Sequence, residues 1–185
     1  MPVHTRIVAI DPGINSMGIA CIEIASDYKS ATVVDAYTAK INRLLKRHRI
    51  DECLQFGEHH AKLMLVKDTV LKYCMNWSPL TVCVEHPYLH HSPTTFSTLT
   101  ECILMVRHGV LAYDQCCSFS TFRPSVVKNA VGVDGGSSDK EDMRRAVLKK
   151  DNLFLDVNLD YLDDHAIDAI AVGCSYIFPI IEGVK

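Results

Sequence analysis

Three short runs of β-forming residues open the chain, and turn-forming residues separate them. "RIVAI" (6–10), "GIACIEIA" (18–25) and "ATVVDAYTA" (31–39) consist mostly of Ile, Val, Ala and Thr, and the polar "SDYKS" divides the second run from the third. Short runs of this kind, bounded by turn residues, predict β-strands. We therefore expect an antiparallel meander at the start of the chain.

A long helix is expected over residues 51–77, because apolar side chains recur there at steps of three and four. These positions are Leu63, Val66, Val70, Tyr73 and Trp77. Asp51 and Glu52 suit the positive N-terminal end of such a helix.

Strands and helices alternate in the remainder of the chain. The expected elements are a strand over 80–85, a helix over 95–112, a strand over 116–121, a short helix after Pro124, a helix opened by "SDKE" (138–141) and a last helix over 163–178 ended by Pro179. We interpret "DNLFLDVNLDY" (151–161) as a linker. The order predicts an α/β fold whose five-stranded mixed sheet, an antiparallel meander plus parallel strands, is flanked by helices.

Length and composition fit a single globular domain over 1–185. The chain has 185 residues, enough for a sizeable core, and 48% of them are hydrophobic while 22% are charged. Its eight cysteines show neither a CxxC pair nor a zinc-ligand spacing. No signal-peptide pattern and no apolar run of about 20 residues is evident. We expect a cytoplasmic protein with no membrane association.

Carboxylates stand where two of the expected strands end. Asp11 follows the first strand and leads into a Pro-Gly turn, and Glu85 ends the strand over 80–85. If these strands are parallel neighbours, both acids emerge at one edge of the sheet, where open α/β sheets bind ligands. Two adjacent carboxylates repel unless a cation lies between them.

The last helix offers a third acid. Asp168 borders the apolar stripe that should face the sheet, and His165 and Asp164 lie three and four residues earlier on the same face. Such a group suits Mg²⁺ or Mn²⁺. Each acid also has a plainer interpretation: Asp11 as a turn residue, Glu85 as a surface charge, and Asp163 or Asp164 as a helix N-cap.

Taken together, four motifs resemble those of RuvC-type Holliday-junction resolvases, which have the RNase H-like, or retroviral-integrase, fold. The motifs are "IDPGINSMGIA", "VEHPY", "RPSVVKNAVGVDGGSSDKEDMRRAV" and "HAIDAIAVG". They occur in the family's order and span nearly the whole chain. The resemblance implies an Mg²⁺-dependent endonuclease, of bacterial or phage origin, that cuts four-way DNA junctions.

The resemblance also implies roles for individual residues. Asp11, Glu85 and Asp168 correspond to metal-binding acids, and His165 corresponds to the fourth ligand position, for which Asp164 is the alternative. Lys128 and Lys140 correspond to lysines beside the scissile phosphate. Tyr88 corresponds to an aromatic that inserts at the strand exchange, and Phe96 is its rival.

Because the net charge is −3, binding to DNA must depend on a local basic patch. The stretch "KINRLLKRHR" (40–49) is either such a patch or a solvated helix. The candidate basic contacts are Lys40, Arg43, Lys46, Arg47, Arg49, Arg123, Lys128, Lys140, Arg144 and Arg145.

The expected reaction is phosphodiester hydrolysis assisted by two Mg²⁺ ions about 3.5–4 Å apart, for which Mn²⁺ should substitute. A four-way junction has two-fold symmetry, so a homodimer would cut opposite strands as a pair. The apolar stripes near 63–77 and 96–110 either form the subunit interface or face the sheet.

Three other functions are compatible with part of this pattern. The Asp-Pro-Gly turn also occurs in actin-like ATPases and sugar kinases, but those need two such lobes. A junction-binding protein without activity would not need all the acids. An RNase H-like nuclease that acts on Y-shaped or flap DNA, or on RNA, is the strongest alternative, because it would share the metal site.

Overall fold

The first three strands form the antiparallel meander that the sequence predicts. β1 (Thr5–Asp11) pairs with β2 (Met17–Ile24), and β2 pairs with β3 (Ala31–Ala39), both antiparallel. The coordinates are a computed structural model that describes residues 5–88, 92–133 and 140–183, with the backbone alone for His48 and Lys140.

Parallel strands extend the meander on both sides. β4 (Thr81–Glu85) pairs with β1, and β5 (Ser118–Phe122) pairs with β4. β6 (Leu153–Leu155) pairs with β3. In the described residues the sheet thus has the order β5-β4-β1-β2-β3-β6, which confirms the mixed α/β sheet but adds a sixth strand to the predicted five.

The sixth strand lies within residues 151–161, for which the sequence predicts a linker. Leu153 is buried, and the main chain on either side is tied to β3: Ala31 donates to the Asn152 carbonyl at 2.9 Å and Asp156 donates to the Val33 carbonyl at 3.0 Å. Three residues are too few to show a strand period in sequence, so tertiary pairing defines this strand.

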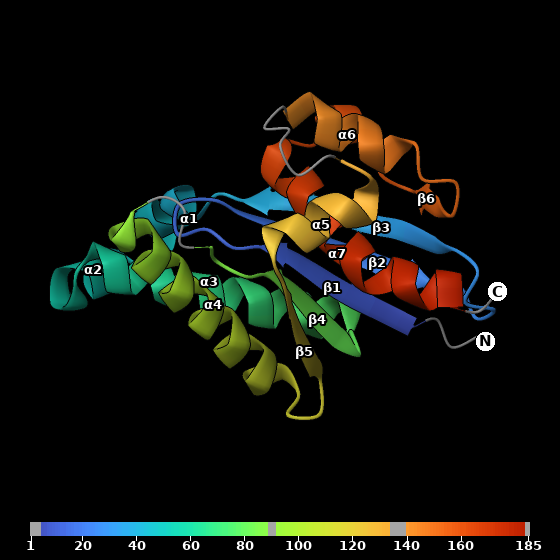
Figure 1. Cartoon of the computed structure of the whole chain (residues 1–185). Helices are drawn as coiled ribbons and strands as arrows, with labels where there is room; N and C mark the ends of the chain where they lie inside the picture. The colour runs from blue at the N-terminus through green and yellow to red at the C-terminus, as the bar shows by residue number, and fades with distance from the viewer. Residues whose placement is uncertain (1–4, 89–91, 134–139, 184–185) are drawn as a thin grey trace.

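Helices cover both faces of the sheet (Figure 1). On one face lie α1 (Ile41–His48), α3 (Glu58–Trp77) and α4 (Pro93–Tyr113), with α2 (Ile50–Phe56) beside α3. On the other lie α5 (Pro124–Val131), α6 (Lys140–Leu148) and α7 (Asp164–Gly183), and the short 3-10 helix η1 (Leu159–Tyr161) precedes α7.

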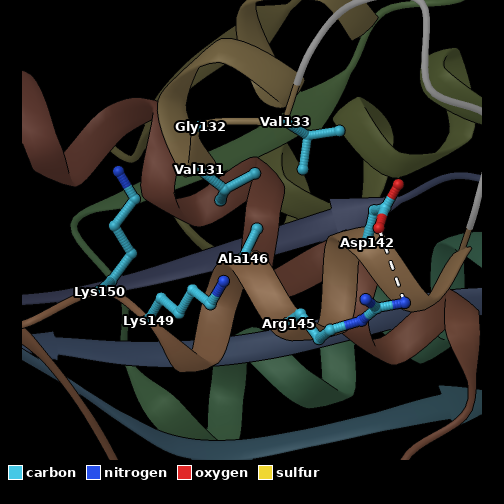
Figure 2. A pocket seen from close by; sticks show the side chains of 8 residues that line it. All are labelled: Val131, Gly132, Val133, Asp142, Arg145, Ala146, Lys149 and Lys150. Atoms are coloured by element: carbon cyan, nitrogen blue, oxygen red, sulfur yellow. Dashed lines mark ion pairs between the residues drawn. The ribbon is translucent and has the colours of Figure 1, made fainter.

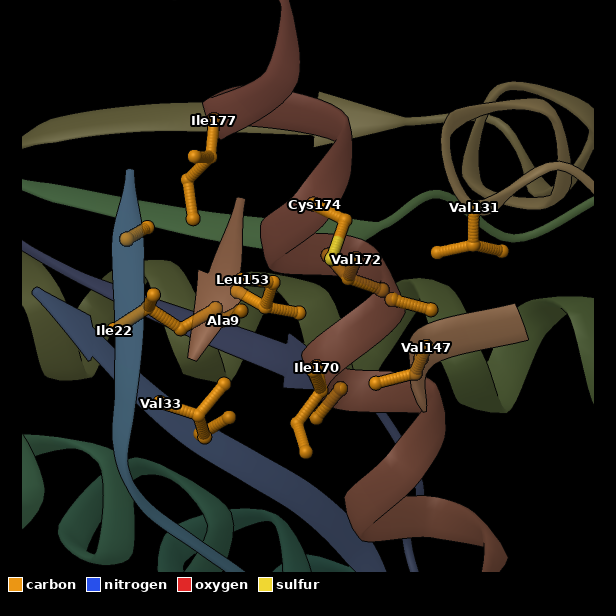
Figure 3. Packing of buried hydrophobic residues seen from close by; sticks show 14 of the residues in the cluster. Ala9, Ile22, Val33, Val131, Val147, Leu153, Ile170, Val172, Cys174 and Ile177 are labelled. Carbon is orange, nitrogen blue, oxygen red and sulfur yellow. The ribbon is translucent and has the colours of Figure 1, made fainter. Parts of the chain in front are cut away.

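Alternation along each strand divides the core into two layers. Val8 and Ile10 of β1 pack with α3 and α4, whereas Ile7 and Ala9 pack with α7. Figure 3 shows the second layer, where Ile170 and Cys174 of α7 lie among side chains of the sheet and of the helices beside it.

The predicted helix over 51–77 is wrong in its first part. The chain forms α1, then α2, and α3 begins only at Glu58. Gly57 has a φ of 88°, a left-handed value that interrupts the helix and that glycine adopts without strain. Asp51 and Glu52 therefore head α2, and "KINRLLKRHR" forms α1.

The predicted end of the last helix is also wrong, because α7 continues through Pro179 to Gly183. A proline inside a helix removes one main-chain hydrogen bond. Pro179 itself is exposed, while Ile177, Phe178 and Ile181 around it are buried. Burial of these side chains offsets the lost bond.

By length and composition alone, α7 could cross a membrane, and it is one such helix among the described residues. However, 67% of its apolar window is buried inside the protein, where it packs against β1, β2 and α5. This is the placement of a core helix.

Candidate active site

Asp11 and Glu85 end neighbouring parallel strands, as the sequence predicts. Ile10 of β1 is in register with Val84 of β4, so the two acids follow one matched pair. Both side chains continue the alternation that puts Ala9 and Cys83 in the layer beneath α7. The carboxylates therefore share one edge and one face of the sheet.

A glycine lets the first turn of α7 reach that edge. Gly18 of β2 is paired with Asp11, and a Cβ at Gly18 would lie 1.8 Å from the carbonyl oxygen of His165. Further along, a Cβ at Gly173 would lie 2.5 Å from Ile22 Cδ1. At position 18 only glycine permits this close approach, because a Cβ would meet backbone, whereas at position 173 the end of the Ile22 side chain would have to shift.

The close approach brings His165 into contact with Asp11. His165 Nδ1 lies 2.8 Å from Asp11 Oδ2. This hydrogen bond raises the pKa of His165 above its ordinary value, although partial burial opposes the shift. Asp163 and Asp168 add to the negative potential around the imidazole.

Glu85 carries the clearest sign that the acids converge. Its pKa is raised to about 7, first by burial and then by the negative charges of Asp11 and Asp168, while Lys128 opposes the shift. The other two predicted acids and the predicted lysine thus act on the Glu85 carboxyl group.

The donor set fits hard divalent cations, because its oxygens carry negative charge that burial leaves poorly compensated. Among the described residues, no three His, Cys, Asp or Glu side chains are already gathered closely enough to hold one ion. Like charges repel, and Asp11 is engaged by His165. A cation would therefore draw the carboxylates together.

Asp163, rather than Asp164, is the N-cap of α7. Its side chain accepts from the backbone N–H of Ala166 at 3.4 Å, and it also accepts short hydrogen bonds from Thr38 and Lys40. Burial alone would raise the pKa of Asp163, but these hydrogen bonds lower it overall. Sequence reasoning expected an N-cap here but missed its attachment to β3.

The predicted basic contacts occupy different environments. Arg49 is paired with Glu52 and Asp68, and Arg144 donates to the carbonyls of Leu159 and Leu162, so both hold the fold together. Lys40 is bound to Asp163.

Arg145 lies 3.7 Å from Asp142. Arg43, Lys46, Arg47 and Arg123 are exposed. The side chain of Lys140 lies outside the described residues.

The two candidate stacking residues differ in exposure. Tyr88 is 63% exposed, whereas Phe96 near the start of α4 is half-buried. The backbone between β4 and Tyr88 is held at its start, because the His86 N–H donates a hydrogen bond to the Phe122 carbonyl at 2.7 Å. Tyr88 is therefore the better placed of the two to meet a ligand at this edge.

No protein-family model matches the chain, and no curated protein matches it in sequence. Its fold, however, is similar to that of solved resolvases. Thermus thermophilus RuvC in complex with a Holliday junction substrate is 18% identical, with 98% of each chain covered and a TM-score of 0.73.

Two further structures are similar over most of the chain. The yeast mitochondrial Holliday junction resolvase Ydc2 is 12% identical, covering 98% of this chain and 80% of its own, with a TM-score of 0.68. The fowlpox virus Holliday junction resolvase is 13% identical, covering 94% and 98%, with a TM-score of 0.61. The chain therefore has the RNase H-like fold of the RuvC-type Holliday junction resolvases.

Proposed function

We propose that this protein is a structure-selective endonuclease that resolves four-way DNA junctions by paired, symmetric nicks. The observation that carries the proposal is geometric: Asp11 and Glu85 end neighbouring parallel strands, and His165 of α7, the helix that also carries Asp168, lies 2.8 Å from Asp11. Its support from the fold is the similarity to RuvC over 98% of each chain.

The acids would hold Mg²⁺, or Mn²⁺ in its place, with two ions per site. Asp11, Glu85 and Asp168 supply the hard oxygens, and His165 or Asp164 the fourth position. Bound ions of this kind lower the pKa of an attacking water and stabilise a departing 3′ oxygen.

The other side chains around the acids have distinct roles in the proposal. If Asp164 supplies the fourth position, His165, which is hydrogen-bonded to Asp11, would instead move a proton to or from the attacking water. Lys128, whose charge acts on Glu85, would neutralise charge that develops on the phosphate, with Lys140 as its partner. Tyr88 offers a ring on which an unpaired base can stack.

A homodimer would match the two-fold symmetry of the junction. The stripes on α3 and α4 are not available as an interface, because Val66, Val70, Val106 and Val110 are buried in the core. The proposed interface must therefore use another surface.

A cleavage panel tests the proposal. Matched four-way, Y-shaped, flap and RNA substrates would be incubated with the protein in Mg²⁺, and we expect cuts only in the four-way junction. Preferred cutting of Y-shaped or flap DNA, or of RNA, would replace the proposal with the alternative nuclease.

An Asp11→Asn variant tests the metal site in the same panel. It should bind the junction but fail to cut it, because one acid of the site is lost. Cutting by this variant at the wild-type rate would overturn the assignment of the acids.

A further inference from the structure

A groove of about 840 Å³ lies between β3, α1 and α3. It starts at Lys40, which is bound to the N-cap residue of α7, and it follows α3 from Leu65 to Asn76. That stretch of helix is about 16 Å long. The groove therefore leads from the candidate active site along the side of the protein.

Positive charge lines the groove. Arg43 and Arg47 lie one turn apart on α1, and Lys72 lies opposite on α3. All three side chains are exposed, and in the part of the chain that the structure describes none of them forms an ion pair.

Acidic groups near the groove are neutralised or stand at its end. Asp68 is paired with Arg49. Asp35 lies beyond the groove, in the hollow formed with Tyr37 and Trp77, and accepts a hydrogen bond of 2.9 Å from Tyr73. The potential along the groove is thus positive up to the level of Asn76.

The lining suits a phosphate backbone better than exposed bases. Binding of single strands without sequence preference depends on aromatic rings that stack successive bases. Here Tyr37 is partly exposed, but Tyr73 beside it is only 5% exposed, with ring centroids 5.7 Å apart.

We propose that this groove holds the sugar–phosphate backbone of one duplex arm of the junction, with Arg43, Arg47 and Lys72 as its phosphate contacts. The inference rests on the proposed function. It adds Lys72 to the DNA contacts that the sequence suggested. It leaves out Arg49 and Arg144, because Arg49 is paired with acidic side chains and Arg144 donates to main-chain carbonyls.

A second basic hollow, of about 450 Å³ between α5 and α6, is a less suitable anion site (Figure 2). Arg145 points toward Asp142, and Lys149 and Lys150 follow the C-terminal end of α6. Cations at that end are explained by the negative pole of the helix. Lys149 therefore serves as a control for Lys72.

The test measures junction binding as a function of salt. An Asp11→Asn background prevents cutting, and the slope of log K against log salt would be compared with and without Lys72→Ala, and with Arg43→Ala, Arg47→Ala and Lys72→Ala together. We expect the magnitude of this negative slope to decrease by about 0.9 for the single change and by about 2.7 for the triple change. With each phosphate contact that is lost, binding releases fewer counterions from the DNA.

Lys149→Ala and Lys29→Ala remove exposed lysines elsewhere, and they should leave the slope unchanged. An unchanged slope in the triple variant, or an equal decrease in the controls, would overturn the proposal that the groove binds the DNA backbone. Unfolding midpoints within error of the parent would show that the variants are folded.

A second measurement identifies the bound element. Replacing one pair of junction arms by single strands should weaken binding by the parent but not by the triple variant. Equal weakening of binding by the parent and by the triple variant would contradict the proposal that the groove holds a duplex arm. Failure of the parent itself to prefer junctions over linear duplex would instead overturn the proposed function, so the two failures are distinguishable.

Discussion

The fold disfavours the charged form of the Glu85 carboxyl group. Glu85 stands on an interior strand, partly buried, with two further carboxylates near it. A glutamate that served only as a surface charge would end its strand in water. The position of Glu85 therefore favours a task that needs its negative charge.

The raised pKa of Glu85 predicts how stability depends on pH. A carboxyl group whose folded pKa is about 7, against an ordinary value near 4.5, binds more protons in the folded state. Its contribution to stability therefore falls as pH rises from about 4.5 to about 7. Glu85→Gln removes this loss, so its advantage over the wild type should grow by roughly 2 kcal/mol between pH 5 and pH 8.

Urea unfolding in EDTA at both pH values measures this difference. Mg²⁺ at pH 8 provides the control, because a bound cation should restore the stability of the wild type while acting less on the variant. A difference between the two proteins that is the same at pH 5 and pH 8 would show that the fold does not raise the pKa of Glu85.

At the scale of elements, the site depends on how closely α7 approaches β2. Gly18→Ala places a methyl group where the carbonyl oxygen of His165 now lies, so the start of α7 must move. We expect a loss of about 1–3 kcal/mol in unfolding free energy and a larger relative loss of cleavage, because His165 and Asp168 would move away from Asp11 and Glu85. Thermal unfolding and single-turnover cleavage measure the two effects.

Gly183→Ala is the matched control, since a Cβ there meets nothing within 4 Å. It should change unfolding free energy by no more than about 0.5 kcal/mol. If Gly18→Ala behaved in the same way, the close approach would have no role in building the site.

The attachment of α7 to β3 through Asp163 gives a separate prediction. Asp163→Ala removes the N-cap and the bonds from Thr38 and Lys40, and should cost about 1 kcal/mol of stability. Asp163→Asn keeps a capping oxygen, and should cost less. Chemical denaturation of the two variants separates the cap from the charge, and equal losses would mean that the ion pair with Lys40 dominates.

The sequence predicted the elements and site features that follow from local pattern. Asp11 and Glu85 were found because parallel strands end at one edge, and Asp168 because it borders an apolar stripe. Thr38 and Asp163 are 125 positions apart, and no local pattern connects them. β6, the break at Gly57 and the extension past Pro179 were likewise decided by tertiary pairing, one backbone angle and core burial.

At the scale of the whole molecule, the candidate surfaces lie around one edge. The acids, Tyr88, Lys128 and the start of the groove all border the carboxyl ends of β1, β4 and β3. In the proposed function each protomer presents one site, which would cut one strand. Resolution of a junction requires two cuts, so the unit of function should be the dimer.

This reasoning predicts the product made by mixed dimers. Purified dimers that combine one wild-type and one Asp11→Asn subunit, carrying different affinity tags, would act on a supercoiled plasmid with an extruded cruciform. We expect nicked circles from mixed dimers and linear plasmid from wild-type dimers, because each active site cuts only its own strand. Gel electrophoresis separates the two products. Linear plasmid from mixed dimers at the wild-type rate would mean that one site makes both cuts. If light scattering showed that the active wild-type protein is a monomer, a dimer would not be needed.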